Sequence, residues 1–424
     1  MRAWAIGCEC PCTANRSLSD GGAPAAHTAP ASDGCGGPWP VRNLLDRRRV
    51  VPIVSEIEFG LDTFGGVTND AEGKPLPHPR VIRDLVDDAV VADQVALDFF
   101  GVGEHHRPDF AVSSPEMVLA AIASRTQRIR LGSAVTVLSS DDPVRGFERF
   151  ATLDAVSAGR AEIVAGRGSF IESFPLFGYD LRDYEVLFEE KLALLAALLK
   201  EQPVTWEGTT RAPLTDQRVF PTTAGGLKAW VGVGGSPESV VRTARHGFGL
   251  FLAIIGGPPA RFAPYIDLFE RAQDELGVAR RPVAVHSPGL VADTDEQARA
   301  IVHDGWLAMR ERMGRERGWP PPSPGDFERE IETGSLYVGS PETVAKKIAA
   351  TLGVLKVERF DFKYDQPVQH ADQLRSITLY GEKVVPMVKD LLARRAPGDR
   401  VVTTTRGRAS PDLSVACETG IAFV

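Results

Sequence analysis

Cysteine is confined to the two ends of this sequence. Of its five cysteines, Cys8, Cys10, Cys12 and Cys35 lie near the start and Cys417 lies near the end. The body of the chain therefore has neither a disulfide framework nor a thiol nucleophile. The CECPC cluster is followed by no second Cys or His pair at zinc-site spacing, so we favour a segment without a metal over a metal site there.

Long apolar runs and clustered basic charge are also missing. The longest apolar candidate, LALLAALL at residues 192–199, falls far short of the roughly 20 residues that span a bilayer. The start of the chain lacks the apolar core of a secretory signal, so we expect a cytoplasmic protein. The net charge of −8 comes with no basic stripe, which argues against nucleic acid or an anionic membrane as a partner. Small molecules are the expected partners.

The composition is that of a folded protein with loosely organised ends. The 424 residues are 43% hydrophobic and 25% charged, which excludes disorder of the whole chain. Residues 1–52 are rich in Gly, Ala, Ser and Pro and lack periodicity, so we predict a disordered extension there. Residues 396–424 are predicted to be a flexible tail, and residues 53–395 one folded domain.

Apolar runs of strand type alternate with helical patterns along the folded part. Residues 81–94, for example, carry an apolar stripe of Ile82, Leu85, Val86, Ala89 and Val90 at helical spacing. The strand-like runs cover residues 56–64, 97–104, 129–138, 161–168, 228–235, 248–255, 282–292 and 358–365. Strands that are apolar on both faces and alternate with helices are typical of a parallel sheet. Eight such units predict an α/β fold, a (β/α)8 TIM barrel with insertions.

The main rival is an open, doubly wound sheet. Such a sheet commonly carries the dinucleotide-binding pattern G-x-G-x-x-G directly after a strand. The two nearest candidates, GVGGSP at residues 232–237 and GRGSFI at residues 166–171, both lack the third glycine. The barrel is therefore favoured.

A glutamate and two histidines stand where the second predicted strand ends. In a barrel, catalytic groups lie at the C-terminal ends of the strands, and Glu104, His105 and His106 occupy that position. Adjacent residues of an extended segment point in opposite directions, so the two imidazoles do not readily share a metal ion. We favour one histidine facing the cavity as a base, with hydrogen bonding of the pair to loop backbone as the alternative.

Two further strand ends are suited to an anion. The segment AGRGSF places Arg167 between two glycines, which allow close approach of a ligand to the backbone. The segment GVGGSPES leads directly into a helix N-terminus with Ser236 and Ser239, and free N–H groups at such an end bind phosphate. Each loop alone is equally well explained as a tight turn, but together they favour a phosphate-bearing cofactor.

These segments together resemble a known family. GEHHRPDF, LGSAVTVLSSDDPVRGFERFATLDAVSAGRAEIVAGRGSF, LFGYD and VGSPETVAKKI resemble the bacterial luciferase-like flavin monooxygenases, over about residues 54–393. The resemblance implies the same barrel, with FMN as the usual cofactor and a deazaflavin in one branch. It also implies an assembly of two identical subunits.

The resemblance assigns roles to individual residues. His105 takes the place of the active-site histidine beside the flavin ring, and residues 252–255 would line the edge of the ring. Ala134 and Val135 fall where the family has a non-prolyl cis peptide under the ring. The residues expected at the flavin phosphate are Arg167, Gly168, Ser169, Gly235, Ser236 and Ser239.

The implied reaction transfers one oxygen atom of O2 to an organic substrate by means of reduced FMN. His105 is expected to move a proton, and Glu104 either orients it or satisfies backbone donors. Gly166 stands where the light-emitting luciferases carry a cysteine, so no bioluminescence is expected. Phe59, Phe64, Phe110 and Phe170 predict a pocket for an apolar substrate.

Other functions remain open at this point. Because the sequence has no nicotinamide fingerprint, the electrons are expected to arrive on FMN from a separate flavin reductase. A deazaflavin-dependent reductase or dehydrogenase on the same barrel is one alternative, and a flavin-binding protein without turnover is another. The proline-rich segment at residues 315–335 is predicted to be either a lid or an inert surface insertion.

Overall fold

The computed structural model describes residues 57–394, except residues 169, 319 and 366. The extension predicted for residues 1–52, the tail predicted for residues 396–424 and all five cysteines lie outside the described residues.

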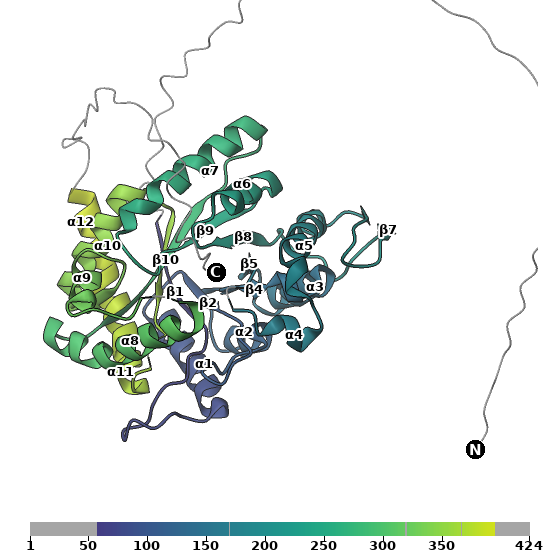
Figure 1. Ribbon diagram of the computed structural model, residues 1–424. Helices are drawn as coiled ribbons and strands as arrows, with labels where there is room; N and C mark the ends of the chain where they lie inside the picture. The colour runs from purple at the N-terminus through teal and green to yellow at the C-terminus, as the bar shows by residue number, and fades with distance from the viewer. Residues whose placement is uncertain (1–56, 169, 319, 366, 395–424) are drawn as a thin grey trace, which may run out of the picture. The chain divides into compact units, whose positions relative to one another are not determined.

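Parallel strands close into a barrel in the described part of the chain (Figure 1). Their order around the barrel follows the sequence, and the last strand pairs with the first through the register Phe59↔Phe360. The strands are β1 (Glu58–Thr63), β2 (Phe99–Val102), β3 (Arg130–Ser133), β5 (Ala161–Gly166), β8 (Lys228–Val233), β9 (Gly249–Ala253), β10 (Val283–Val291) and β12 (Arg359–Lys363). Each predicted run contains one of these strands, so the TIM barrel is confirmed.

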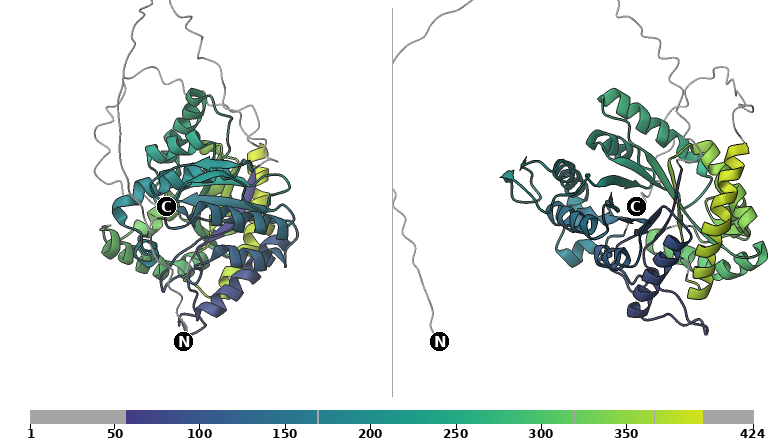
Figure 2. Two further views of the ribbon diagram at one scale, coloured as in Figure 1. Left: turned by 90° about the vertical axis from the view of Figure 1, so that its right-hand side faces the viewer. Right: turned by 180° about the vertical axis from the view of Figure 1, so that it is seen from behind.

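Helices surround the barrel, and the apolar core fills the space between them and the strands (Figure 2). They are α1 (His78–Gln94), α2 (Pro115–Ala123), α3 (Pro143–Val156), α5 (Tyr184–Leu198), α6 (Pro237–His246), α7 (Ala263–Leu276), α10 (Pro341–Leu355), α11 (His370–Leu379) and α12 (Val385–Arg394). A π-helical turn, Tyr380–Val384, joins α11 to α12. None of the described helices combines the length and the apolar character that a bilayer crossing requires.

Helix α1 forms where it was predicted, but its buried face is rotated from the predicted stripe. Ile82 and Val90 are partly exposed, whereas Asp84 and Asp88 are buried. Asp88 is bonded to His370 of α11, with 2.8 Å between Oδ1 and Nε2. The apolar pattern missed this because a buried carboxylate is tolerated when a partner elsewhere in the chain satisfies it.

The insertions form elements of their own. After β5 come α4 (Ser173–Phe177), a 3-10 turn at Leu181–Asp183 and a hairpin of β6 (Val204–Trp206) with β7 (Leu214–Gln217). Two short elements follow β3, namely β4 (Thr136–Val137) and a 3-10 turn at Leu138–Ser140, and a 3-10 turn at Pro259–Phe262 precedes α7. After β10 come α8 (Asp295–Arg317), α9 (Asp326–Glu332) and β11 (Tyr337–Gly339). The segment at residues 315–335 therefore contains the end of α8 and all of α9.

Paired charges occupy the interior at the N-terminal end of the barrel. Glu162 and Arg359 are both fully buried, and two guanidinium nitrogens of Arg359 donate to the two carboxylate oxygens at 2.9 Å each. The indole N–H of Trp230 also donates to Glu162, at 2.8 Å. Burial alone would raise the pKa of Glu162, but Arg359, assisted by Lys228 and Arg130, lowers that pKa to about 2.

We predict that Arg359→Met destabilises the barrel strongly. The substitution leaves Glu162 buried without its main cationic partner, which typically costs about 3–5 kcal/mol. The free energy of unfolding, measured by urea denaturation at neutral pH, should fall by that amount. Arg375→Met is the matched control because Arg375 pairs with Asp293 on the surface, where a pair contributes about 1 kcal/mol at most. Equal losses in the two variants would contradict the structural role of the buried pair.

Candidate functional site

The candidate residues follow the C-terminal ends of four neighbouring strands. His105 follows β2, the Ala134–Val135 dipeptide follows β3, Arg167 follows β5 and Ser236 follows β8. These strands are adjacent in the order β2-β3-β5-β8. Parallel strands present their C-terminal ends at the same end of a barrel, so the loops lie at one mouth.

His105 is enclosed by aromatic rings. Its side chain is 8% exposed, and the centroids of Phe110, Phe64 and Phe170 lie 4.4, 4.8 and 4.9 Å from the imidazole centroid. Its Nδ1 atom is 3.1 Å from Oε1 of Glu172, a residue just before α4. A carboxylate in this position fixes the orientation of the ring and leaves Nε2 for a ligand.

His106 has a separate environment. Its Nε2 atom lies 2.9 Å from Oε1 of Glu104, and its ring meets Phe177 edge-on at 5.0 Å. The other oxygen of Glu104 accepts the backbone N–H of Val137 at 3.1 Å. Glu104 thus satisfies a backbone donor and orients His106, whereas Glu172 orients His105. Among the residues that the structure describes, no group of three or more His, Cys, Asp or Glu side chains is arranged to hold a metal ion.

The Ala134–Val135 peptide bond is cis, as the family resemblance predicted. Three glycines give the dipeptide its room. A Cβ atom on Gly101 would lie 2.9 Å from Cβ of Ala134, and one on Gly103 would lie 2.9 Å from the Ala134 carbonyl oxygen. A Cβ atom on Gly166 would lie 2.4 Å from Cγ2 of Val135. The dipeptide therefore packs between the loop that carries His105 and the loop that carries Arg167.

Arg167 is mostly buried, and its guanidinium pairs with the carboxylate of Glu185, the second residue of α5. It also lies over the ring of Tyr184, whose hydroxyl donates to the carbonyl oxygen of Gly168 at 2.8 Å. Gly168 has a φ of +80°, a conformation that favours glycine. Ser169, predicted beside these two residues, lies outside the described residues.

The N-terminus of α6 faces the same charged cluster. Ser236 is the N-cap, and its Oγ accepts the backbone N–H of Ser239 at 3.3 Å and donates to Glu238 at 2.7 Å. Arg242, one turn further along α6, donates to the second oxygen of Glu185 at 3.0 Å. Glu185 therefore bridges the guanidinium groups of Arg167 and Arg242.

This cluster fits a phosphate group. The buried Oγ of Ser239 and Nη1 of Arg242 have no hydrogen-bond partner within the described structure. The hydroxyl of Ser236, with smaller effects from Arg167 and Arg242, holds the pKa of Glu238 below its usual value. Gly235 has a φ of +119° and leads into the free N–H groups of the helix end. Two arginines, two serines and a helix N-terminus are a suitable donor set for an anion.

The predicted pocket is wrong at Phe59 and, within residues 252–255, at Leu252 and Ile254. Phe59 lies on the outer face of β1, fully buried and beneath the ammonium group of Lys389 of α12. Leu252 and Ile254 also belong to the core between strands and helices. Both faces of β9 are apolar, so its sequence did not distinguish the inner face from the outer one. On β1 the face opposite Phe59 carries Gly60 and Asp62, and the apolar residues of this strand therefore pack outward against the helices.

The segment predicted as a lid or an inert insertion touches the mouth. Glu316, at the end of α8, accepts from Arg107 at 2.7 Å, and Arg312 one turn earlier pairs with Asp109. Arg107 also lies 4.7 Å above the ring of Phe170. Helix α8 is thus tied to the loop that follows the two histidines, and its role as a lid stays a prediction.

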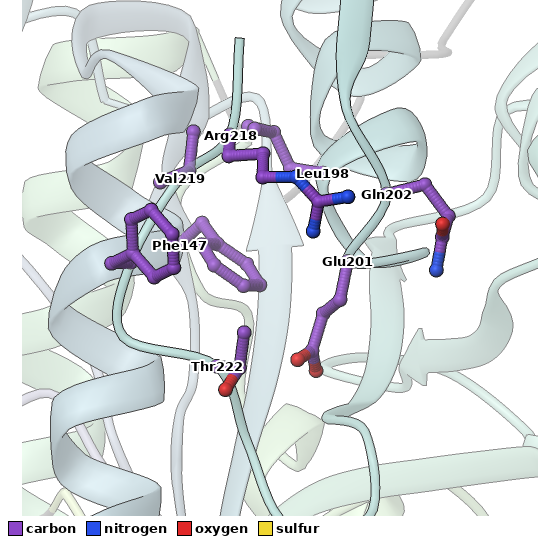
Figure 3. A pocket seen from close by; sticks show the side chains of 8 residues that line it. Phe147, Leu198, Glu201, Gln202, Arg218, Val219 and Thr222 are labelled. Atoms are coloured by element: carbon purple, nitrogen blue, oxygen red, sulfur yellow. The ribbon is translucent and has the colours of Figure 1, made fainter.

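A small cavity opens elsewhere on the molecule. Figure 3 shows its lining, which includes Phe147 of α3, Leu198 of α5, Glu201 and Arg218. None of the candidate residues lines this cavity. It is therefore separate from the site at the barrel mouth.

Two residues of the site were not identified from the sequence. Glu172 is 67 positions from its partner His105, and Arg242 lies inside a helix rather than at a strand end. A regular pattern marks strand ends and helix starts, but it does not state which distant side chains meet. No signal in the single sequence distinguishes these two residues from other surface charges.

Comparison with known proteins relates the chain to one family. The sequence model described as luciferase-like monooxygenase matches residues 59–355. The 4-hydroxyprotoasukamycin monooxygenase of Streptomyces nodosus subsp. asukaensis is 31% identical over 245 residues, which are 54% of this chain and 64% of that protein.

Solved structures share the fold. One is the oxygenating constituent of 3,6-diketocamphane monooxygenase from Pseudomonas putida, in complex with FMN. It has a TM-score of 0.63 and 20% identity, over 78% of this chain and 98% of that one. The coenzyme F420-dependent tetrahydromethanopterin reductase of Methanopyrus kandleri has a TM-score of 0.59 and 19% identity, over 78% and 99% of the two chains.

We predict that His105→Ala raises the pKa of Glu172. Burial, the largest single influence, pushes this pKa upward, but the hydrogen bond and charge of His105 together with backbone hydrogen bonds keep the pKa below its usual value. Removing the imidazole takes away the largest of the influences that lower this pKa and leaves only the backbone hydrogen bonds to oppose burial. Carbon-13 NMR titration of the glutamate carboxyl groups, with Glu172→Gln for assignment, measures the change. His106→Ala is the control because His106 pairs with Glu104. An unchanged titration of Glu172 in His105→Ala would contradict the pairing.

Proposed function

Because the chain belongs to the luciferase-like monooxygenase family, we propose that it is a flavin-dependent monooxygenase that uses reduced FMN and O2 to oxygenate a small apolar organic compound. One observation carries the proposal. The Ala134–Val135 dipeptide packs against Gly103, two residues before His105, and against Gly166, the residue before Arg167. An imidazole and a phosphate-type cluster are thereby held on two sides of one rigid dipeptide, as a mononucleotide with a flat ring requires.

Reduced flavin would supply the electrons and the position at which O2 reacts. The chain itself would orient the ring, exclude water and move a proton. Phe64, Phe110 and Phe170 enclose His105 and keep water from it. With Nδ1 held by Glu172, the Nε2 atom of His105 is the position at which a proton is accepted or returned.

The proposed phosphate contacts are Arg167, Ser236, Ser239 and Arg242. Both arginines pair with Glu185, which is mostly exposed and is free to turn toward solvent when a dianion takes its place. Ser239 Oγ and Arg242 Nη1 would gain the partners that they lack. Arg167 directly follows β5, and the other three donors belong to the N-cap and body of α6, so the phosphate would join two neighbouring βα units.

The proposed function also includes a source of electrons and an oligomeric state. We propose that a separate reductase delivers reduced FMN and that two copies of the chain form the working enzyme. A deazaflavin-dependent reductase or dehydrogenase is the second candidate, because a coenzyme F420-dependent reductase shares the fold. Both candidates use the same imidazole and the same phosphate cluster, so the choice between the two cofactors needs a direct measurement.

A titration separates the candidates. We expect the protein to bind FMN, followed by flavin absorbance, and to change the rate at which added reduced FMN consumes O2. His105→Asn should slow the catalysed step by roughly 10²–10⁴-fold, the usual contribution of a positioned acid–base group, with little change in FMN affinity. Binding of coenzyme F420 without binding of FMN would replace the proposal by the second candidate. FMN binding without any effect on reoxidation would indicate a flavin carrier.

We further predict that Arg167→Ala weakens FMN binding by roughly 10-fold or more, because a charge-assisted contact with phosphate is lost. Riboflavin lacks the phosphate, so its affinity should be nearly the same in the variant and the parent protein. Arg182→Ala is the control, since Arg182 is exposed and pairs with Asp180. An equal loss of FMN and riboflavin affinity would show that Arg167 acts through the fold and not through the phosphate.

A further inference from the structure

Three ionisable side chains lie inside the barrel and have no part in the site described above. Asp62 of β1 and Asp361 of β12 are fully buried, and His286 of β10 is 4% exposed. His286 is two residues from Ala284 on β10, so their side chains lie on the same face, and Ala284 packs with Phe251 inside the barrel. The imidazole of His286 also meets Phe251, at 5.2 Å between centroids. The three side chains therefore share the barrel interior.

Asp62 holds the imidazole of His286. The Oδ2 atom of Asp62 lies 2.7 Å from Nδ1 of His286, although β12 stands between their two strands. Asp361 is on that intervening strand, as the register partner of both His286 and Gly60. A Cβ atom on Gly60 would lie 2.3 Å from Oδ1 of Asp361, so the glycine makes room for the carboxyl group.

Most of the remaining polar atoms of Asp62, His286 and Asp361 lack a hydrogen-bond partner. Nε2 of His286, Oδ1 of Asp62 and both oxygens of Asp361 are buried and have no hydrogen bond within the described part of the chain. Buried polar groups are bonded in the large majority of cases, and an exception calls for an explanation. A group that served stability alone would cost free energy through these atoms. A ligand or a transferred proton would account for them.

The group adjoins the floor of the proposed flavin site. A Cβ atom on Gly101 would lie 3.2 Å from Cβ of Asp62 and 2.9 Å from Cβ of Ala134, so only this glycine separates the two residues. Val135, the second residue of the dipeptide, packs against a cluster inside the barrel that contains Phe251, and the ring of Phe251 meets the imidazole of His286 edge-on. Asp62 and Phe251, the two neighbours of the His286 imidazole, thus both adjoin residues that pack with the dipeptide between His105 and Arg167.

We propose that His286, held by Asp62, is a second proton-exchanging residue of the site and serves the bound ring or substrate from the barrel interior. This inference rests on the proposed function. An ionised Asp62 can only accept a hydrogen bond, so Nδ1 carries a hydrogen and Nε2 is left to take up a proton. The proton taken up at Nε2 leaves an imidazolium paired with Asp62, and the same proton is returned when the product departs.

The surrounding charges fit this role. The charged groups that act on Asp361 are Arg359 of its own strand, Asp62 and Glu58 of β1 and Glu162 of β5, and Asp62 is also bonded to His286. Burial, assisted by the neighbouring carboxylates and opposed by Arg359, raises the pKa of Asp361 well above its usual value. Asp361 is therefore favoured as the neutral acid, which can donate a hydrogen bond beside His286 without adding a second negative charge.

The alternative explanation is that Asp62 and His286 only stabilise the barrel. The variant His286→Asn distinguishes this explanation from proton exchange. The asparagine amide supplies a donor near the position of Nδ1, so the bond to Asp62 is retained, but it has no group at Nε2 and does not titrate. His370→Asn is the matched control. His370 pairs with Asp88 outside the barrel, between α11 and α1, in the same imidazole–carboxylate arrangement.

The experiment uses the full chain, reduced FMN and O2. We expect His286→Asn to lower the rate constant of the flavin reaction by roughly 10-fold or more, to remove one limb of its pH profile and to leave the dissociation constant of FMN within about twofold. His370→Asn should change only the melting temperature. Unchanged rate and pH profile in His286→Asn would overturn the inference.

A second measurement does not depend on turnover. In the parent protein labelled with ¹⁵N-histidine, adding FMN should shift the ring nitrogen resonances of His286, assigned by their loss in His286→Asn. If FMN binds and shifts His105 but not His286, the inference is overturned and the proposed function stands. If neither FMN nor coenzyme F420 binds, the proposed function fails, and this inference fails with it.

Discussion

Close packing around the Ala134–Val135 dipeptide is the constraint on which the mouth of this barrel depends. Gly101, Gly103 and Gly166 come from the strands on either side and leave no room for a Cβ atom. Because Gly103 and Gly166 immediately precede the segments that carry His105 and Arg167, any movement of the dipeptide would move both. The loops that carry the imidazole of His105 and the guanidinium of Arg167 follow different strands. Direct packing against the same dipeptide fixes their relative positions.

Charge is distributed unequally along the barrel interior. At the N-terminal end, Arg359 and Glu162 satisfy each other through two hydrogen bonds, and Trp230 adds a third. Two residues beyond Arg359, at the middle of β12, Asp361 and its register partner His286 have polar atoms that lack partners within the described residues. The paired end stabilises the closed barrel, as is usual at the face opposite the active site. These unpaired groups lie between the paired charges and the C-terminal ends of the strands, where unsatisfied polar atoms can serve a ligand.

Each of the two mouth histidines has its own carboxylate and its own aromatic neighbours. His105 bonds to Glu172 among three phenylalanines, whereas His106 bonds to Glu104 and meets Phe177. Adjacent positions on an extended segment point in opposite directions, so one imidazole is enclosed and the other braces the loop. The division explains how two neighbouring histidines can have different tasks.

Local patterns along the chain were enough to predict the barrel, the placement of His105 and Arg167 at strand ends, and Ser236 as a helix cap, because periodicity and capping are local properties. The family resemblance also marked Ala134 and Val135. The folded structure was needed to show that Glu172 meets His105, that Glu185 joins Arg167 to Arg242, that Phe59 faces outward and that Asp62 meets His286 across β12. Those pairings depend on how the sheet closes and on which face of each strand turns inward, and residues far apart in the chain fix both together.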